Sequence, residues 1–218
     1  MRNRTGRRDY GADDGFTLVE LLVAIAILGI ITVPLSNVVI AYLRNTDATT
    51  ARLIESHDAQ ISSAYWAQDV ASIGARSTTS PFGLNQSVET GVPYGSSLYP
   101  CGTAGTTPIV SLAWDEASGP GAATLVRVAY VVQTVSGQTE LHRLRCEGSP
   151  VVVSDVILAH DLDPSTPQTV ACLGTSGANC AAAGPAVPKS VTLTLTIKDP
   201  KNLGGAYVVR LTGQRRQS

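Results

Sequence analysis

The chain changes abruptly from polar to apolar after its first fifteen residues. These fifteen carry four arginines and three aspartates, whereas Glu20 is the only charged residue between Phe16 and Leu43. The stretch Leu21–Leu43 is 23 residues long and uncharged, enough to cross a hydrocarbon core of about 30 Å as a helix. Arginines precede the stretch and few positive charges follow it closely. The positive-inside rule therefore places the N-terminus in the cytoplasm and the chain after Tyr42 outside.

The helical pattern continues beyond the apolar stretch. Between Arg44 and Ala75 there is no proline, and Gly74 is the only glycine. Apolar residues recur near one helical face, while charged residues can point elsewhere. The apolar residues are Leu43, Ala51, Ile54, Ile61, Tyr65, Trp66, Val70 and Ile73. The charged residues are Arg44, Asp47, Arg52, Glu55 and Asp69. We expect one helix from Phe16 to about Ile73, roughly 90 Å long, apolar all round in its first half and amphipathic in its second. Gly29 should weaken it, and Pro34 should kink it or remove one hydrogen bond.

Strand patterns fill the rest of the chain, between loops at 74–108 and 161–188. The expected strands are Ile109–Trp114, Leu125–Thr134, Thr139–Cys146, Val151–Leu158, Val191–Ile197 and Ala206–Leu211. Ser136-Gly137 should turn the second strand into the third as a hairpin, and Asp199–Gly205 should form the last turn. The fold class is therefore α+β, a long N-terminal helix packed on a C-terminal antiparallel β-sheet. The expected segments are 1–15 as a leader, 16–43 as the transmembrane helix, 44–75 as its amphipathic continuation and 76–218 as a β-rich head outside the cytoplasm.

Composition narrows the classes of partner and of covalent cross-link. The net charge is −1 and only 5% of residues are aromatic, so nothing indicates direct binding of nucleic acid. The four cysteines, an even number in an exported chain, favour disulfides, and sequence alone leaves three pairings open. We favour Cys172–Cys180, which closes a short loop, and that choice leaves Cys101–Cys146. A zinc site is the alternative, although the chain has no Cys-x-x-Cys pair and its three histidines are scattered.

The junction between leader and apolar run reads Gly15-Phe16-Thr17-Leu18-Val19-Glu20. Residues 2–45 resemble the prepilin cleavage and methylation signature of type IV pilins and pseudopilins. The resemblance implies that a prepilin peptidase and methyltransferase cuts after Gly15 and methylates the new amine of Phe16. It also implies that Glu20 of one subunit meets the Phe16 amine of a neighbour. Gly29 and Pro34 match the family's habit of a helix weakened mid-membrane, although Pro34 comes a few residues earlier than the proline common in major pilins.

Glu20 needs a physical reason to lie inside an apolar run. An ionised carboxylate in hydrocarbon costs at least a few kcal/mol and needs a partner, which the α-amine of Phe16 provides after cleavage. One alternative is that Glu20 snorkels to the lipid headgroups. An ordinary signal peptide or signal anchor is another, but it would have a shorter apolar core and would not need the carboxylate.

The remaining chemistry is sparse. The chain has no G-x-S-x-G, no phosphate-binding glycine loop and no H-E-x-x-H, so we expect no enzyme, no catalytic residue and no cofactor. Asp161 and Asp163 beside His160 could bind calcium or form a solvated turn. Arg143 and Arg145, expected on an exposed strand face, could bind an anion. His57 lies on the helix and His142 in a strand.

We therefore expect a structural subunit of a pilus or pilus-like fibre for secretion or DNA uptake. The segment Tyr65–Arg76 is similar to one in PilW-type minor pilins and J-type minor pseudopilins, which favours a minor subunit. The expected partners are the prepilin peptidase, other pilin or pseudopilin subunits and, before assembly, membrane lipid. The subunit would first be a single-pass membrane protein and then part of a surface filament. The alternatives are a membrane-anchored extracellular binding protein that is processed but does not polymerise, and a secreted enzyme.

Overall fold

The structure is a computed structural model that describes residues 15–78, 83–174, 179–198 and 206–216. The leader before Gly15 and the expected turn at 199–205 lie outside the described residues. The chain divides into two compact units, Met1–Arg52 and Leu53–Ser218, here called the N-terminal and C-terminal units. One helix, α1 (Leu18–Ser72), contributes its first part to the N-terminal unit and its last part to the C-terminal unit.

From Leu18 to Leu43, α1 is apolar on all sides apart from Glu20 and a few uncharged polar residues, and its side chains are exposed. Among the residues that the structure describes, one helical stretch, Leu18–Thr46, is long and apolar enough to cross a membrane. Pro34 lies inside the helix, which continues through it. Proline has no N–H, so the carbonyl of Ile30 lacks its usual donor, as the sequence indicates. The hydroxyl groups of Thr32 and Ser36 bond back to the helix backbone on either side of this position.

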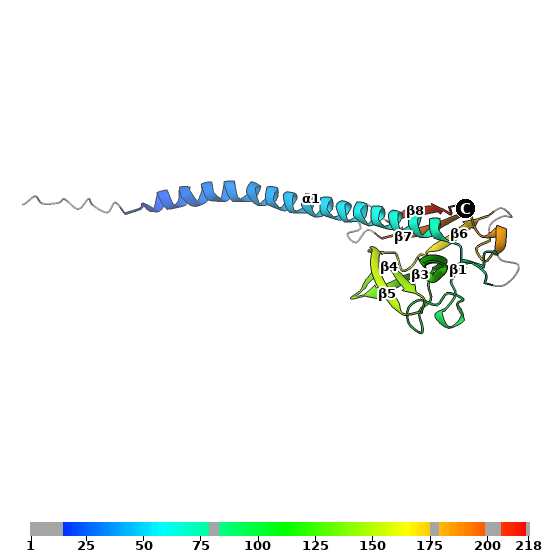
Figure 1. Ribbon diagram of the computed structural model, residues 1–218. Helices are drawn as coiled ribbons and strands as arrows, with labels where there is room; N and C mark the ends of the chain where they lie inside the picture. Colours follow the sequence, from blue (N-terminus) through cyan, green and yellow to red (C-terminus); the bar gives the residue numbers. More distant parts are fainter. Residues whose placement is uncertain (1–14, 79–82, 175–178, 199–205, 217–218) are drawn as a thin grey trace, which may run out of the picture. The chain divides into compact units, whose positions relative to one another are not determined.

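In the C-terminal unit the strands form two antiparallel sheets. The first has the order β1-β2-β3-β4-β5 and the second the order β6-β7-β8. Strands of both sheets are labelled in Figure 1. Their bounds are β1 Val88–Thr90, β2 Val110–Gly119, β3 Ala122–Val135, β4 Gln138–Glu147, β5 Val152–Ala159, β6 Thr169–Leu173, β7 Ser190–Ile197 and β8 Tyr207–Gln214, with short 3-10 helices at Tyr94–Ser96 and Gly184–Ala186. An isolated bridge between Leu162 and Ile197 joins the end of the first sheet to β7. The α+β, pilin-like class is confirmed, with the strands in two sheets instead of one.

Two strands were not predicted. Strand β1 has only three residues, and β6 lies inside the expected loop 161–188. Strand β6 pairs with β7 along its full length, from Thr169 opposite Thr194 to Leu173 opposite Ser190. A short segment forms a strand when a longer neighbouring strand supplies its backbone hydrogen-bond partners. The residue pattern of such a segment is therefore a weak signal.

The hairpin between β3 and β4 forms as predicted. Val135 pairs with Gln138, so that two residues make the turn. The two turn residues adopt positive φ, 53° at Ser136 and 84° at Gly137. This is the conformation of the two-residue hairpin turn whose twist matches that of the strands.

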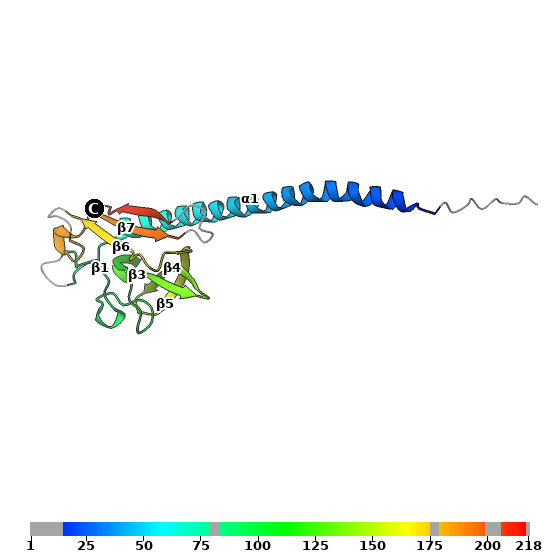
Figure 2. The same cartoon turned by 180° about the vertical axis from the view of Figure 1, so that it is seen from behind.

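The last turns of α1 form the centre of the core, with β7 and β8 alongside them (Figures 1 and 2). Trp66, Val70 and Ile73 are buried as expected. The Trp66 ring meets Tyr130 of β3 edge-on at 4.9 Å, and its Nε1 donates to the Val191 carbonyl of β7 at 3.1 Å. The helix thus contacts both sheets. Ile54, expected on the same face, is 50% exposed, because the packed face begins further along the helix.

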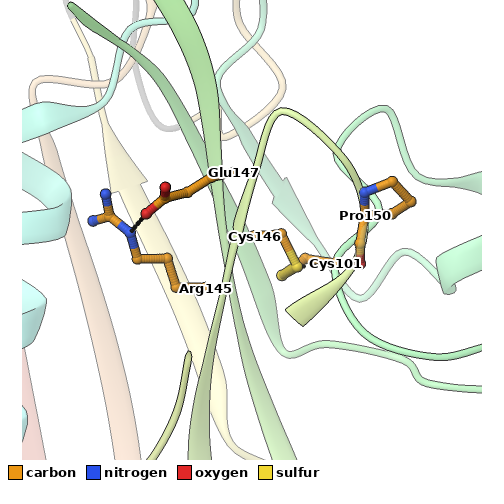
Figure 3. The surroundings of a disulfide bond; sticks show 5 residues. All are labelled: Cys101, Arg145, Cys146, Glu147 and Pro150. Atoms are coloured by element: carbon orange, nitrogen blue, oxygen red, sulfur yellow. Dashed lines mark hydrogen bonds and ion pairs between the residues drawn. A yellow bond between two sulfur atoms is a disulfide. The ribbon is translucent and has the colours of Figure 1, made fainter. Parts of the chain in front are cut away.

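Both favoured disulfides are present, Cys101–Cys146 and Cys172–Cys180, and no cysteine is free. All four sulfur atoms are therefore used, which rules out the zinc alternative. Figure 3 shows Cys146 on one side of β4 and its neighbours Arg145 and Glu147 on the other. Cys101 is buried there beside Ala129, Val131 and Leu144, so the first disulfide holds the loop before β2 against the face of the sheet that Cys146 shares.

Gly213 lies where β8 passes closest to α1. A Cβ at this position would lie 2.5 Å from the Cβ of Val70, and both atoms belong to rigid elements. We expect Gly213→Ala to lower the free energy of unfolding of the C-terminal unit by about 1–3 kcal/mol, since the core is overpacked. Urea unfolding of the full chain in detergent, followed by tryptophan fluorescence, measures the change. Gly95→Ala is the control, because nothing lies within 4 Å of its Cβ position; equal midpoints for the two variants would contradict the clash.

Candidate processing and assembly site

The start of α1 is fixed by Thr17. Its side-chain Oγ1 accepts a hydrogen bond from the Glu20 backbone N–H at 3.3 Å, and its carbonyl accepts one from the Leu21 N–H at 3.1 Å. This is the arrangement of a helix N-cap, where threonine satisfies a donor that the first turn leaves free. The helix therefore begins at Leu18. Gly15 and Phe16 lie before it in non-helical chain, with Phe16 84% exposed.

Glu20 lies in the first turn of the helix and is exposed. A carboxylate here interacts favourably with the positive end of the helix dipole. The apolar run from Leu21 to Leu43 contains no basic residue, so it offers Glu20 no cation. A full counter-charge for Glu20 inside an apolar environment has to come from a chain terminus or from another molecule.

The structure places three sequence-predicted residues, Gly15, Phe16 and Glu20, at this helix end, together with the Thr17 cap, which the sequence analysis did not predict. Gly29 and Pro34 lie further along the same helix. The roles proposed for Gly15, Phe16, Glu20, Gly29 and Pro34 stay predictions, since they concern a peptidase, a neighbouring subunit and a bilayer.

A family model described as the prokaryotic N-terminal methylation motif matches residues 12–36. The matched segment is the N-terminal motif of type IV pilins and pseudopilins, and its match supports the resemblance that the sequence indicates. A comparison with curated proteins gives no match, so the assignment rests on this segment. The pilin motif marks a subunit that is processed by prepilin peptidase and assembles with other pilins. The apolar stretch Leu18–Thr46, which begins inside the matched segment, agrees with a single membrane anchor.

The C-terminal unit contains a buried ionic cluster that the sequence analysis missed. Asp69 of α1 is 1% exposed and accepts two hydrogen bonds from Arg143 of β4, from Nε at 2.7 Å and from Nη2 at 2.6 Å. It also accepts the hydroxyl of Tyr130 at 2.7 Å. The Arg143 guanidinium lies over the Tyr65 ring, 4.8 Å from its centroid. Helix, β3 and β4 are therefore tied together by one carboxylate.

This cluster corrects two expectations. Asp69 was expected to point away from the packed face of the helix, and Arg143 was expected on an exposed strand face with Arg145. Arg143 is 4% exposed and is held inside. Charged residues are buried only when paired, and a pair 74 residues apart gives no sequence signal. The sequence did contain one signal that Asp69 is buried, its spacing: Asp69 is four residues from both Tyr65 and Ile73, which puts it on the same side of the helix as these two residues.

The surroundings of Tyr130 and Arg143 raise the pKa of both groups, so that both keep their protons. Burial raises the pKa of Tyr130 well above its ordinary value, and the Asp69 charge and hydrogen bond raise it further. Tyr130 therefore remains a donor. Burial lowers the pKa of Arg143, but the hydrogen bond and charge of Asp69, with a contribution from Tyr130, outweigh this and raise it. Arg143 remains a cation. The cluster ties α1 to the first sheet.

The acidic segment after β5 forms a turn with local hydrogen bonds. Asp163 accepts from the N–H and hydroxyl of Ser165 and from the hydroxyl of Thr166, and these bonds lower the pKa of Asp163. His160 does not join this turn and instead bonds to Asp58 of α1. The geometry favours the solvated turn over the calcium site that the sequence left open.

Proposed function

We propose that this pilin is a minor subunit of a type IV pilus or of a pilus-like fibre for secretion or DNA uptake. The observation that carries the proposal is the Gly15–Phe16 junction, exposed directly before a capped apolar helix whose first turn holds the carboxylate Glu20. The prepilin peptidase cuts after Gly15, and Glu20 meets the Phe16 amine of a neighbouring subunit. The similarity of Tyr65–Arg76 to PilW-type minor pilins and J-type minor pseudopilins supports the minor role.

We place the N-terminus in the cytoplasm, the α1 stretch Leu18–Thr46 in the membrane before assembly, and the C-terminal unit outside. Two disulfides support this topology, because they form and persist in oxidising compartments. The subunit then passes into a surface filament. We assign it no catalytic role, since its side-chain clusters serve its own fold.

The processing step has a direct test. Gly15→Leu puts a bulky side chain where the peptidase is expected to require glycine. We expect nearly all of this variant to remain as full-length precursor, whereas wild-type protein begins at Phe16 with a methylated amine. Intact-mass measurement with N-terminal sequencing of membrane fractions separates the two forms.

Gly11→Leu is the matched control, since it adds the same side chain within the leader, away from the junction. We expect it to be cut normally. A wild-type protein that began after residue 40 would instead show cleavage by an ordinary signal peptidase.

A further inference from the structure

Strand β7 runs between two ends of the C-terminal unit. Lys189 comes directly before this strand and Lys198 directly after it. A strand rises about 3.4 Å per residue, so the eight residues of β7 separate the two ends by roughly 25 Å. Strand β8 pairs with β7 over the same length, from Gln214 at one end to Tyr207 at the other. Both strands lie alongside the last turns of α1 (Figures 1 and 2).

Carboxylates gather at the end where β7 finishes. The Lys198 N–H donates to the Asp161 carbonyl at 2.8 Å, and the Asp163 N–H donates to the carbonyl of Thr196 in β7 at 2.9 Å. Burial, together with the charges of Glu55, Asp58 and Asp161, raises the pKa of Tyr207 at this end to about 12. Glu140 joins them through His160, which contacts both Glu140 and Asp58. We call this set the acidic end: Glu55, Asp58, Glu140, Asp161 and Asp163, with Lys198 offsetting one charge.

Basic side chains gather at the opposite end, where β7 begins. The Arg215 N–H donates to the Lys189 carbonyl at 2.8 Å, and the Arg216 N–H donates to the carbonyl of Ala71 at the end of α1 at 3.1 Å. Arg76 follows soon after the same helix end, and its backbone N–H donates to Asp115, which offsets one charge. We call this set the basic end: Arg76, Lys189, Arg215 and Arg216.

The cations of the basic end lack a carboxylate in contact within the described residues. Ion pairs in this part of the chain have His142, Arg143, Arg145 and His160 as their basic partners. The Nε of Arg215 is buried and has no hydrogen-bond partner among the described residues. An unpaired buried donor costs free energy that an incoming acceptor can recover. A partner surface that carries carboxylates would therefore supply what the fold leaves out.

We propose that the basic end of one molecule binds the acidic end of a second copy of this chain. Charge complementarity selects this partner, because the anionic surface that the basic end needs is present on the same molecule. The two ends are too far apart to meet within one chain. The contact joins two different surfaces, so it repeats head to tail into an open row of molecules. The inference goes beyond the proposed function, since it needs neither cleavage after Gly15 nor Glu20.

Chemical crosslinking of the full chain in detergent tests the contact. A carbodiimide joins an amine to a carboxylate that touches it, and Lys189 is the lysine of the basic end. We expect mass spectrometry to find Lys189 joined to a carboxylate of the acidic end, between isotope-labelled and unlabelled chains mixed before the reaction. The yield should fall at least about fivefold between about 0.02 M and about 0.5 M salt, because salt screens the attraction between exposed charges. No such crosslink at low salt overturns the proposal and leaves some other anion as the ligand of the basic end.

Two arginines of the same segment provide a matched pair of variants. Arg216→Glu reverses an exposed charge of the basic end and should lower the yield at least about threefold. Arg210→Glu makes the same change at an exposed position opposite Thr194, in the middle of β7, and should keep the wild-type yield. Equal yields from the two variants would contradict a contact through the basic end.

Mixing two variants tests the head-to-tail arrangement. Glu55→Lys reverses a charge of the acidic end and should lower the yield as Arg216→Glu does. In a mixture, the Glu55→Lys chain brings an unchanged basic end and the Arg216→Glu chain an unchanged acidic end. We expect the crosslink between these two ends to return to within about twofold of the wild-type yield, which also shows that both variants are folded. A mixture that stays as low as either variant alone overturns the arrangement.

Discussion

Glu20→Ala is expected to leave the pilin cut and membrane-bound but to keep it out of fibres. The substitution makes the helix more apolar, so membrane insertion survives or improves. Processing also survives, because the peptidase reads the Gly15 side of the junction and the Thr17 cap bonds to a backbone N–H. What is lost is the attraction between Glu20 and a neighbour's Phe16 amine. At 4 Å and an effective dielectric constant of about 20, this attraction is about 4 kcal/mol, against about 1 kcal/mol in water.

Sheared fibres and crosslinks to sibling pilins measure the effect. We expect the amount of Glu20→Ala protein in either fraction to fall at least about tenfold, since each 1.4 kcal/mol changes an equilibrium by about that factor. Glu20→Gln keeps shape and hydrogen bonding without charge and should give an intermediate amount. Entry of Glu20→Ala at the wild-type level would refute charge pairing for this subunit. A wild-type protein that is cut but found in neither fraction would favour the alternative, a membrane-anchored binding protein that does not polymerise.

Asp69→Ala is expected to have the largest effect on folding. It leaves Arg143 charged, 4% exposed and without its carboxylate. Removing one partner of a buried ion pair costs about 3–5 kcal/mol, a large share of the 5–15 kcal/mol typical of a domain. The hydroxyl of Tyr130 loses its acceptor as well. We expect the thermal midpoint of the C-terminal unit to fall by about 10 °C or more, measured by tryptophan fluorescence of the full chain in detergent.

Two further variants separate charge from packing. In Asp69→Ala/Arg143→Met no buried charge remains, so the double variant should be more stable than Asp69→Ala alone. Glu116→Ala is the matched control, because it removes the partner of another arginine of β4: Arg145 and Glu116 are 2.7 Å apart, but the Glu116 side chain is 56% exposed. Exposed pairs contribute about 0–1 kcal/mol, so this control should differ little from wild type. Equal losses for Asp69→Ala and Glu116→Ala would contradict the role assigned to burial.

The residues of the candidate processing site could be named from sequence because they are neighbours in the chain, and their roles stay predictions. Gly15, Phe16, Thr17 and Glu20 lie within six residues, and the apolar helix follows at once. The structure added the Thr17 cap, which fixes where the helix begins. The spacing of threonine and glutamate is itself a known helix-start signal, so this feature was readable in principle.

Among the elements, sequence by itself determined those whose signal is local. The long helix, the Ser136-Gly137 hairpin and the alternating strand β7 each follow from periodicity or turn chemistry over a few residues. Tertiary structure alone decided the division into two sheets, the pairing of β6, the burial of Asp69 against Arg143 and the need for glycine at position 213. Each of these depends on which distant segments meet. The interactions involved are the backbone hydrogen bonds between strands, an ion pair removed from water and a steric contact. They arise only once the chain has folded.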